Sequence, residues 1–462
     1  MRLAILYSSV LLCLSSAAHS QLLPEQPVTG VLLPQVTERL ERTTQSLAQQ
    51  KLLQQQQLLE QQRLTEALAL KANLADPLTV LPEVLPIVNV QGQVRWTEVR
   101  VEQGFRAVER EWLLLVSDTE WQQLQQRWPR LREYTQQQQD LAAIGLLMIT
   151  LKVPEELDSA AALDREFQQT LTKLAGRNHL YQPQQASTTT TTAAVTSLQT
   201  HMCQLPVTLG MIDTAIAEAL PALTPETERL QISQQHFLPE DIPRSYGHGT
   251  AVAGVLAAKH PQITPLLANL HLYSASAFYP SNEFQQSATL AHILSALNWL
   301  VSQNVTVVNM SLTGPANPVL AATIQQLAKR DIILVAAAGN GGPAAAPLYP
   351  AAYEEVLAVT AVDAQLQLYR WANQGDYVEF AAHGVKVNTL AVSGEVSPQS
   401  GTSMATPVVS AAVGCLRAQY PHWSATQIRQ HLRLQARDLG EPGQDKQFGY
   451  GVISAPLKAD LQ

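Results

Sequence analysis

The sequence predicts an α/β protein whose C-terminal region, residues 201–462, forms a doubly wound, mostly parallel sheet. Two continuous apolar runs, residues 305–310 and 332–337, are typical of strands that are covered on both faces. The segment between them, residues 318–329, has the amphipathic spacing of a connecting helix. A region of about 260 residues is long enough to bury a complete core.

The composition excludes some classes of partner. The chain has 462 residues, of which 46% are hydrophobic and 15% charged, and its formal net charge is -8. Nucleic acids and anionic membrane surfaces attract basic proteins, so this charge does not favour either as a partner.

The N-terminus has the pattern of a secretory signal peptide over residues 1–20. Arg2 supplies a positive charge, residues 3–14 are mostly apolar, and Ala18-His19-Ser20 forms a small-x-small site before Gln21. A buried or membrane-spanning helix is the alternative, but the apolar stretch is short for a bilayer. We therefore expect an exported protein, periplasmic or extracellular, without a membrane span in the mature chain.

Residues 34–76 are predicted to form a Gln/Leu-rich helical or coiled-coil segment. Leucines recur there with Gln, Glu and Arg between them, and the spacing drifts from a strict heptad. An amphipathic helix docked on its own protein fits the pattern equally well. Asp76-Pro77 ends the helix.

Residues 81–185 are predicted to form a small α+β sandwich. Strands are expected at residues 112–116 and 146–153, with helices beginning at Asp118 and Asp158, the second reaching about residue 174. This order fits a β-α-β-β-α-β unit.

A linker is predicted to follow this unit. Residues 186–200 are rich in threonine, and the preceding Gln182-Pro183-Gln184-Gln185 also lacks apolar side chains to bury. An exposed tract of this kind is where a protease would cut.

Two cysteines, Cys203 and Cys415, would remain after export. In an oxidising compartment they could pair. The alternative is a free Cys415, buried in a helix, with Cys203 unpaired nearby. Both possibilities stay open at this stage.

Three separated segments carry an acid, a histidine and a serine. Asp213 follows an apolar run, His248 lies between two glycines, and Ser403 lies in the stretch 400–407 ahead of a helix. A serine hydroxyl is a poor nucleophile until a base such as histidine takes its proton, and the imidazole needs a carboxylate to fix its tautomer. The chain order Asp, His, Ser distinguishes this set from the other two common orders of the triad.

A fourth residue, Asn340, could stabilise the charge that develops on attack. It follows the strand predicted at residues 332–337, and its side-chain amide can donate to an oxyanion together with the Ser403 backbone N–H. Ser403 is expected at the positive end of a helix, with Pro407 in the first turn.

Residues from about 200 to 455 resemble the subtilisin-like serine protease family. Four segments match the family's motifs: Asp213-Thr214, His248-Gly249-Thr250 through Gly254, Ala338-Gly339-Asn340, and Ser400 through Pro407. Further agreement comes from residues 308–312 and 449–451. One departure is Ala215, where the family usually has glycine; a positive φ there would cost alanine about 1 kcal/mol.

The resemblance implies a subtilisin-like fold and assigns the site residues. It makes Asp213, His248 and Ser403 catalytic, places Asn340 in the oxyanion hole, and gives a substrate pocket formed by Ser311, Leu312, Thr313, Gly314, Ala337, Ala338 and Gly339. These pocket residues are small and uncharged, so we expect an apolar or medium-sized side chain before the scissile bond.

No cofactor or metal is assigned from the sequence. Members of the family often bind structural calcium, but no loop is specific enough to name a site. Asp363, Asp376 and Glu379 are candidate ligands, and as surface acids they would be ordinary.

These observations predict an exported serine endopeptidase that acts on protein or peptide substrates through an acyl-enzyme. Residues 81–185 resemble, in element order, the propeptides of such enzymes, so we expect a zymogen that cuts itself between residues 182 and 200 and whose partner is its own N-terminal region. The alternative is a catalytically idle subtilisin-like protein that acts as an envelope interaction or scaffold module through its N-terminal helix.

Overall fold

The computed structural model describes residues 81–168, 174–183, 200–224, 229–282 and 285–457. The chain divides into two compact units, Met1–Pro77 and Leu78–Gln462, and the described residues belong to the second. The predicted signal peptide (1–20), the Gln/Leu-rich segment (34–76) and nearly all of the linker (186–200) lie outside the described residues. Within the described ranges, no helix has the length and apolar character needed to cross a bilayer.

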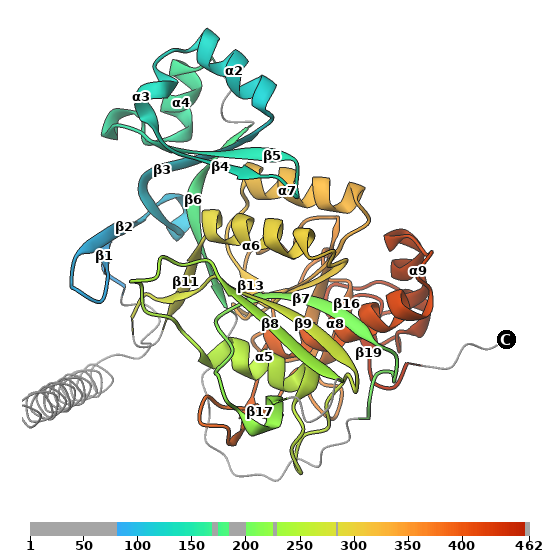
Figure 1. Cartoon of the computed structure of the whole chain (residues 1–462). Helices are drawn as coiled ribbons and strands as arrows, with labels where there is room; N and C mark the ends of the chain where they lie inside the picture. Colours follow the sequence, from blue (N-terminus) through green and yellow to red (C-terminus); the bar gives the residue numbers. More distant parts are fainter. Residues whose placement is uncertain (1–80, 169–173, 184–199, 225–228, 283–284, 458–462) are drawn as a thin grey trace, which may run out of the picture. The chain divides into compact units, whose positions relative to one another are not determined.

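A parallel sheet forms the centre of the C-terminal region (Figure 1). In the described part of the chain it has eight strands in the order β19, β16, β15, β14, β12, β7, β9, β8, and every neighbouring pair is parallel. Their bounds, in that order, are Val452–Ile453, Phe380–His383, Val356–Val362, Ile333–Ala337, Val307–Met310, Val207–Asp213, Leu270–Ser276 and Leu230–His236.

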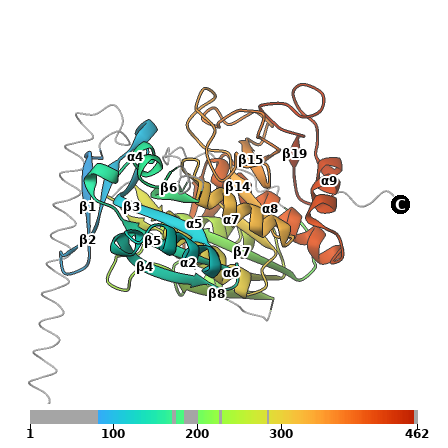
Figure 2. The same ribbon diagram turned by 90° about the horizontal axis from the view of Figure 1, so that it is seen from above.

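Helices cover both faces of this sheet (Figures 1 and 2). On one face α5 (Gly247–Ala257), α8 (Thr402–Gln419) and α9 (Ala425–Gln435) share a core with strand residues such as Val335. On the other face α6 (Leu290–Ser302) and α7 (Pro318–Lys329) pack on alternate residues such as Leu334. Alternate side chains of β14 therefore enter two different cores, which explains its continuous apolar sequence and confirms the predicted doubly wound sheet.

Helix α7 has the predicted bounds. The Asn317 side chain caps it by accepting from the Val319 N–H at 2.9 Å, and Pro318 occupies the first position, where a missing N–H costs nothing.

The N-terminal region, residues 81–183, is an antiparallel sheet with three α-helices on it in the described part of the chain. Its strands are β1 (Val84–Val88), β2 (Val94–Arg100), β3 (Arg106–Val116), β4 (Thr135–Leu141), β5 (Leu146–Lys152) and β6 (Ala175–Pro183), and its helices are α2 (Asp118–Arg127), α3 (Leu131–Tyr134) and α4 (Ala160–Glu166). Trp112, Trp121 and Phe167 lie in its core. The hairpin β1–β2 was not predicted from the sequence.

The caps of two helices in this region correct the sequence prediction. Ser117, not Asp118, caps α2: its hydroxyl accepts from the Glu120 N–H, and the Glu120 carboxylate accepts from the Ser117 N–H. Ser159, not Asp158, caps α4. That helix ends at Glu166 rather than near residue 174, and Gln168, two residues beyond its end, has a left-handed φ of 53°.

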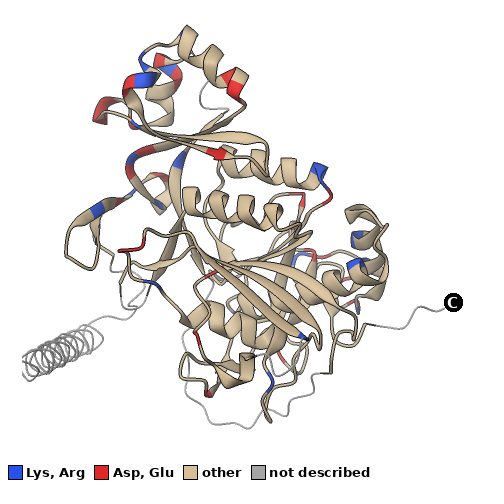
Figure 3. Ribbon diagram, in the orientation of Figure 1, with Lys and Arg blue, Asp and Glu red and all other residues tan. Residues whose placement is uncertain are grey.

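Smaller elements complete the described fold. They are the hairpin β17 (Val387–Leu390) and β18 (Val396–Gln399), the short strands β10 (Tyr279–Pro280), β11 (Gln286–Thr289) and β13 (Leu312–Thr313), and the 3-10 turns Glu102–Gly104, Glu155–Leu157 and Pro221–Leu223. Charged side chains gather on α2, α3 and α4 and are absent from α5 and α6 (Figure 3).

Cys203 and Cys415 form a disulfide, with their Cα atoms 6.0 Å apart. Of the two possibilities left open by the sequence, the structure contains the paired one. The bond ties the segment that precedes β7 to helix α8.

Candidate active site

Asp213 is the last residue of β7, at the carboxyl edge of the parallel sheet. Its side chain is 1% exposed, and Oδ1 accepts from the backbone N–H of Thr214 at 2.7 Å. Ala215, two residues on, is fully buried and does not have a left-handed φ. The alanine that departs from the family pattern therefore causes no backbone strain.

His248 is the second residue of α5 and is bonded to Asp213. Its Nδ1 lies 2.7 Å from Oδ1 and 2.9 Å from Oδ2 of the carboxylate, and the histidine is 1% exposed. Because an ionised carboxylate can only accept, Nδ1 carries the proton and Nε2 is left as the basic nitrogen. Nε2 is buried and has no hydrogen-bond partner within the described residues.

The glycine after His248 permits this arrangement. A Cβ at Gly249 would overlap the carbonyl oxygen of Thr214, and the Gly249 N–H donates to the Thr214 hydroxyl at 2.7 Å. The start of α5 is thereby held against the end of β7, which brings the histidine to the aspartate.

Ser403 is the second residue of α8 and is fully buried. The sequence predicted Pro407 in the first turn of this helix. The helix begins at Thr402, so Pro407 lies in its second turn instead. A proline cannot donate to the carbonyl four residues earlier, which is that of Ser403. The Ser311 hydroxyl donates to this carbonyl instead, at 3.0 Å.

Asn340 follows β14 and contacts the start of α8. Its Oδ1 accepts from both the backbone N–H and the hydroxyl of Thr402, each at 3.0 Å. Two donors at one oxygen fix which end of the amide faces Thr402, and so direct the NH₂ end elsewhere. The sequence analysis did not single out Thr402, although it lies inside the serine motif and bonds to Asn340.

The structure brings the four predicted residues to one edge of the sheet. Asp213 is bonded to His248 there, and Asn340 is bonded to Thr402, which precedes Ser403 in the chain. Helices α5 and α8, which carry His248 and Ser403, pack in the same hydrophobic core.

The seven predicted pocket residues are all buried and come from two neighbouring strand ends. Ser311 to Gly314 follow or form the ends of β12 and β13, while Ala337 to Gly339 end β14, the parallel neighbour of β12. Their common position at the carboxyl edge agrees with a binding site at that edge.

The strand β6 of the N-terminal region lies against these pocket residues. On one edge Pro183 pairs with Leu312 and Gln182 with Thr313; on the other edge strand β11 pairs with Leu180 and Tyr181. Gln182 and Pro183, which the sequence analysis assigned to a linker, are therefore strand residues. The local sequence does not predict a strand at Gln182 and Pro183, because the residues that pair with them lie more than a hundred positions later in the chain.

The remaining contacts between the N-terminal region and the parallel-sheet region include the buried carboxylate of Glu98, which is paired with Arg106 inside the N-terminal region. Glu98 is fully buried and accepts from Arg106 at 3.2 Å and from the Tyr279 hydroxyl at 2.8 Å. Burial raises the pKa of Glu98 despite these donors. The Asn178 side chain accepts from the N–H of Ala291, at the start of α6.

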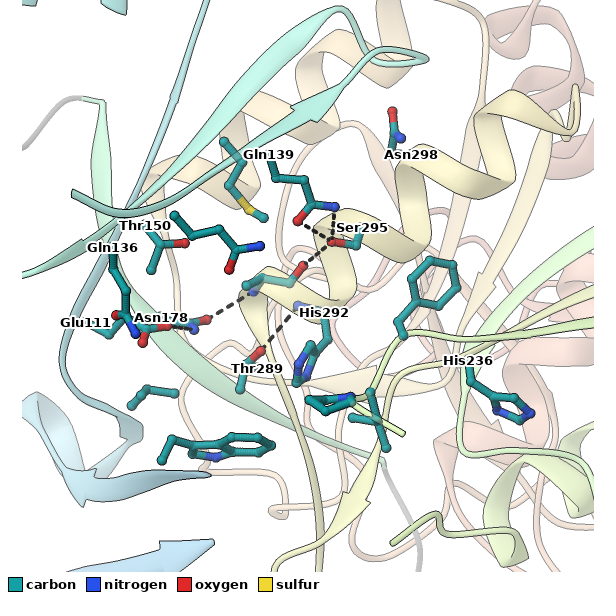
Figure 4. Close-up of a pocket in the computed structure, with 18 of the residues that line it drawn as sticks. Glu111, Gln136, Gln139, Thr150, Asn178, His236, Thr289, His292, Ser295 and Asn298 are labelled. Carbon is teal, nitrogen blue, oxygen red and sulfur yellow. Dashed lines mark hydrogen bonds between the residues drawn. The ribbon is translucent and has the colours of Figure 1, made fainter. Parts of the chain in front are cut away.

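A polar cavity of about 920 Å³ lies between β3, β4, β5 and β6 and helix α6 (Figure 4). Glu111, Gln139 and Thr150 line one side, and His292 and Ser295 line the other. Burial raises the pKa of Glu111 and lowers that of His292 to about 4. Neither the three predicted catalytic residues nor Asn340 lines this cavity.

The candidate metal ligands have other partners. Glu379 is 2% exposed, so it is not the surface acid that the sequence predicted, and it forms ion pairs with Arg429 and Arg433. Asp363 accepts from backbone N–H groups of its own loop, and Asp376 lies 3.6 Å from Lys446 Nζ. Among the described residues, no group of three or more His, Cys, Asp or Glu side chains could hold a metal ion.

A histidine–aspartate pair and a serine at a helix start, at the carboxyl edge of a parallel sheet, define the class of α/β serine hydrolases. The chain belongs to the subtilase family, whose defining pattern matches residues 206–451, just over half of the chain.

Several curated proteases are similar to this region. Minor extracellular protease Epr of Bacillus subtilis is 34% identical over 216 residues, which are 46% of this chain and 33% of Epr. Subtilisin DY of Bacillus licheniformis is 32% identical over 259 residues, 55% of this chain and 90% of its own. A thermostable alkaline protease of Halalkalibacterium halodurans is 34% identical over 212 residues, 45% and 56% of the two chains. The matched segment thus spans a third of the first relative and most of the second.

Proposed function

We propose that the protein is an exported serine endopeptidase that hydrolyses peptide bonds through an acyl-enzyme. The observation that carries this proposal is the Asp213–His248 hydrogen bond, which leaves Nε2 as the base at the edge where α8 begins, with Ser403 as its second residue. The alternative, an idle scaffold, is not favoured, because the relatives of this chain are named as proteases.

In the proposed mechanism His248 Nε2 takes the proton of Ser403 as its Oγ attacks the substrate carbonyl. Asp213 stabilises the imidazolium, and the oxyanion receives hydrogen bonds from the Asn340 amide and the Ser403 N–H. The imidazolium then protonates the leaving amine. A water molecule then gives a proton to Nε2 and attacks the acyl carbonyl. The ester bond to Ser403 Oγ breaks, the imidazolium returns the proton to that oxygen, and the acid is released.

We further propose that the chain is a zymogen and that β6 occupies its substrate-binding cleft. The strand is hydrogen bonded on both edges, to β13 and β11, so a substrate could not pair with the same strands. Tyr181 is fully buried, and its hydroxyl donates to the Pro315 carbonyl at 3.0 Å.

The pairing of β6 supports a cut near the N-terminal end of the predicted range, residues 182–200. Gln182 pairs with Thr313 and Pro183 with Leu312, and Ser311 is the pocket residue that precedes Leu312. Ser311 donates to the carbonyl of Ser403. We therefore propose cleavage after Gln184, whose side chain is uncharged and of medium size.

The N-terminal region is proposed to leave after this cut. The polar cavity beside α6 and the hydrogen bonds of Glu98 and Asn178 resemble the wet, polar contacts of interfaces that form and dissociate. Export agrees with the disulfide, since such bonds persist in oxidising compartments.

N-terminal sequencing and mass spectrometry of the purified wild-type, Ser403→Ala and Ser393→Ala chains test the proposal. Ser393 is a turn serine in a loop that carries none of the proposed catalytic residues, and it controls for loss of a hydroxyl. We expect the wild type and Ser393→Ala to begin at Gln185 and Ser403→Ala to stay unprocessed there. The same processed N-terminus in all three would exclude self-cleavage.

Fluorophosphonate labelling separates catalysis from processing. The processed protein should be labelled at Ser403, and a folded, processed sample that takes no label would overturn the assignment as a serine hydrolase. A wild-type chain sampled before processing that takes no label, together with a labelled processed form from the same preparation, would support occlusion of the cleft by β6.

A further inference from the structure

A second buried asparagine, Asn373, holds the loop that carries Asn340. Asn373 is fully buried, and its Oδ1 accepts from the Gly341 N–H at 2.7 Å. Its own backbone N–H donates to the Gly339 carbonyl at 3.0 Å. The residues before and after Asn340 are therefore both bonded to Asn373.

The same side chain also reaches the far end of this loop. Asn373 Nδ2 donates to the Ala346 carbonyl at 3.2 Å, and the Gly342 N–H donates to the carbonyl of Trp371 at 2.8 Å. Residues 371–373 thus lie along the loop and bond to it at four points, three of which involve Asn373.

The loop needs such support because glycines surround Asn340. Gly339 has a φ of +116° and Gly342 a φ of +94°, which are left-handed values that glycine adopts without strain. The same freedom would let the loop take other conformations. A Cβ at Gly339 would lie 3.0 Å from Asn373 Cγ, so the backbone and this side chain are already in close contact.

Thr402 fixes the rotation of the Asn340 amide, but the bonds to Gly339 and Gly341 set where its backbone lies. An oxyanion donor is effective only when it is held within about half an ångström of the productive position. We propose that Asn373 is a positioning residue that acts through Asn340 on the oxyanion. This inference rests on the proposed serine protease function.

A double-mutant cycle in the processed enzyme tests this role with a peptide amide substrate. Asn340→Ala should lower kcat by about a hundredfold to a thousandfold. Asn373→Ala should lower kcat by about tenfold to a hundredfold and leave KM within about twofold, because the lost interaction acts in the transition state. In the Asn340→Ala background, Asn373→Ala should cost less than about threefold, because the amide it positions is gone.

A peptide boronate, which forms a tetrahedral adduct with a serine, supplies a second measurement. Its affinity should fall in Asn373→Ala by the same factor as kcat. Thr323→Ala is the control for lost stability: it removes a buried 2.8 Å hydrogen bond inside α7 and should lower Tm without changing kcat.

Several outcomes overturn the inference. They are an unchanged kcat in folded Asn373→Ala, an effect confined to KM, or an equal loss of kcat in the Asn340→Ala background. Should Asn373→Ala not fold, Asn373→Leu keeps a side chain of similar size but loses the acceptor for the Gly341 N–H, and kcat should again fall while KM holds. A wild-type chain without amidase activity would instead reject the proposed function itself.

Discussion

Tyr181 and Gly314 are in direct contact: a Cβ at Gly314 would overlap the tyrosine ring. Tyr181 comes from the last strand of the N-terminal region and Gly314 from the predicted substrate pocket. The contact joins two regions of the chain that the sequence analysis treated as separate domains.

The first prediction concerns the Tyr181 hydroxyl. Tyr181→Phe loses its bond to Pro315, worth about 1 kcal/mol, so self-processing should slow by roughly fivefold. Tyr181→Ala removes the whole buried ring and should slow it far more. The rate of appearance of the new N-terminus measures both effects. Tyr134→Phe is the control, because the buried Tyr134 hydroxyl has no hydrogen-bond partner among the described residues; an equal effect there would refute the prediction.

The second prediction concerns the tautomer of His248. Asp213→Asn replaces the acceptor beside Nδ1 by an amide that can donate, which favours a proton on Nε2. We expect kcat on amide substrates to fall by about 10⁴ near neutral pH with a modest change in KM. Steady-state kinetics of the processed variant check this result, and a loss below about tenfold would show that the carboxylate has no such role.

The third prediction is that acid destabilises the unprocessed chain through His292. Burial lowers the pKa of this histidine to about 4, from an ordinary value of 6.5. The unfolded chain therefore binds more protons between those values, so the free energy of unfolding should decrease as the pH falls from 6.5 to 4 and then level off. The full effect is at most about 3 kcal/mol.

The comparison uses denaturant unfolding of the Ser403→Ala chain with and without His292→Phe. The His292 ring lies against Trp96 and Tyr279, and phenylalanine keeps an aromatic ring there. Glu98 and Glu111 have raised pKa values, so their protonation changes the free energy of unfolding in the opposite sense. Both residues are present in both proteins, so their effect cancels in the comparison. The stability of His292→Phe should decline less on acidification, whereas the exposed His422→Gln should behave like the parent. Equal acid sensitivity of all three would be contrary to expectation.

The fourth prediction concerns the disulfide, which closes a loop of 212 residues. Replacing both Cys203 and Cys415 by serine should cost about 2–5 kcal/mol, mainly because the unfolded chain regains freedom. Thermal unfolding with and without a reductant measures this cost. Reduction should lower the Tm of the parent and leave that of the double variant unchanged. A parent whose Tm stays the same after complete reduction would contradict the prediction.

The parallel sheet and the bonded His248–Asp213 pair were predictable from the sequence. Strands such as β12 and β14 are buried on both faces, so their sequences are continuously apolar, and motif residues at strand and helix ends converge at one edge. Ser117 was missed as a cap because serine and aspartate stand side by side and both can cap a helix.

Other features depended on distant partners that local sequence does not reveal. Pro407 lies inside α8 because Ser311, 92 residues earlier than Ser403, supplies the missing donor. Strand β6 continues through Pro183 because its last two residues pair with β13. Asn373 stands outside every motif, and only the fold brings it to Asn340.

Scission of the chain would not by itself open the cleft. Strand β6 belongs to the same sheet as β11 and β13, so its ladder of hydrogen bonds survives when the covalent connection is lost. What changes is molecularity: an internal ligand at high effective concentration becomes a separate one that can diffuse away. Dilution after export would then determine when the cleaved region dissociates, and activity should develop sooner in a dilute medium than in a confined volume.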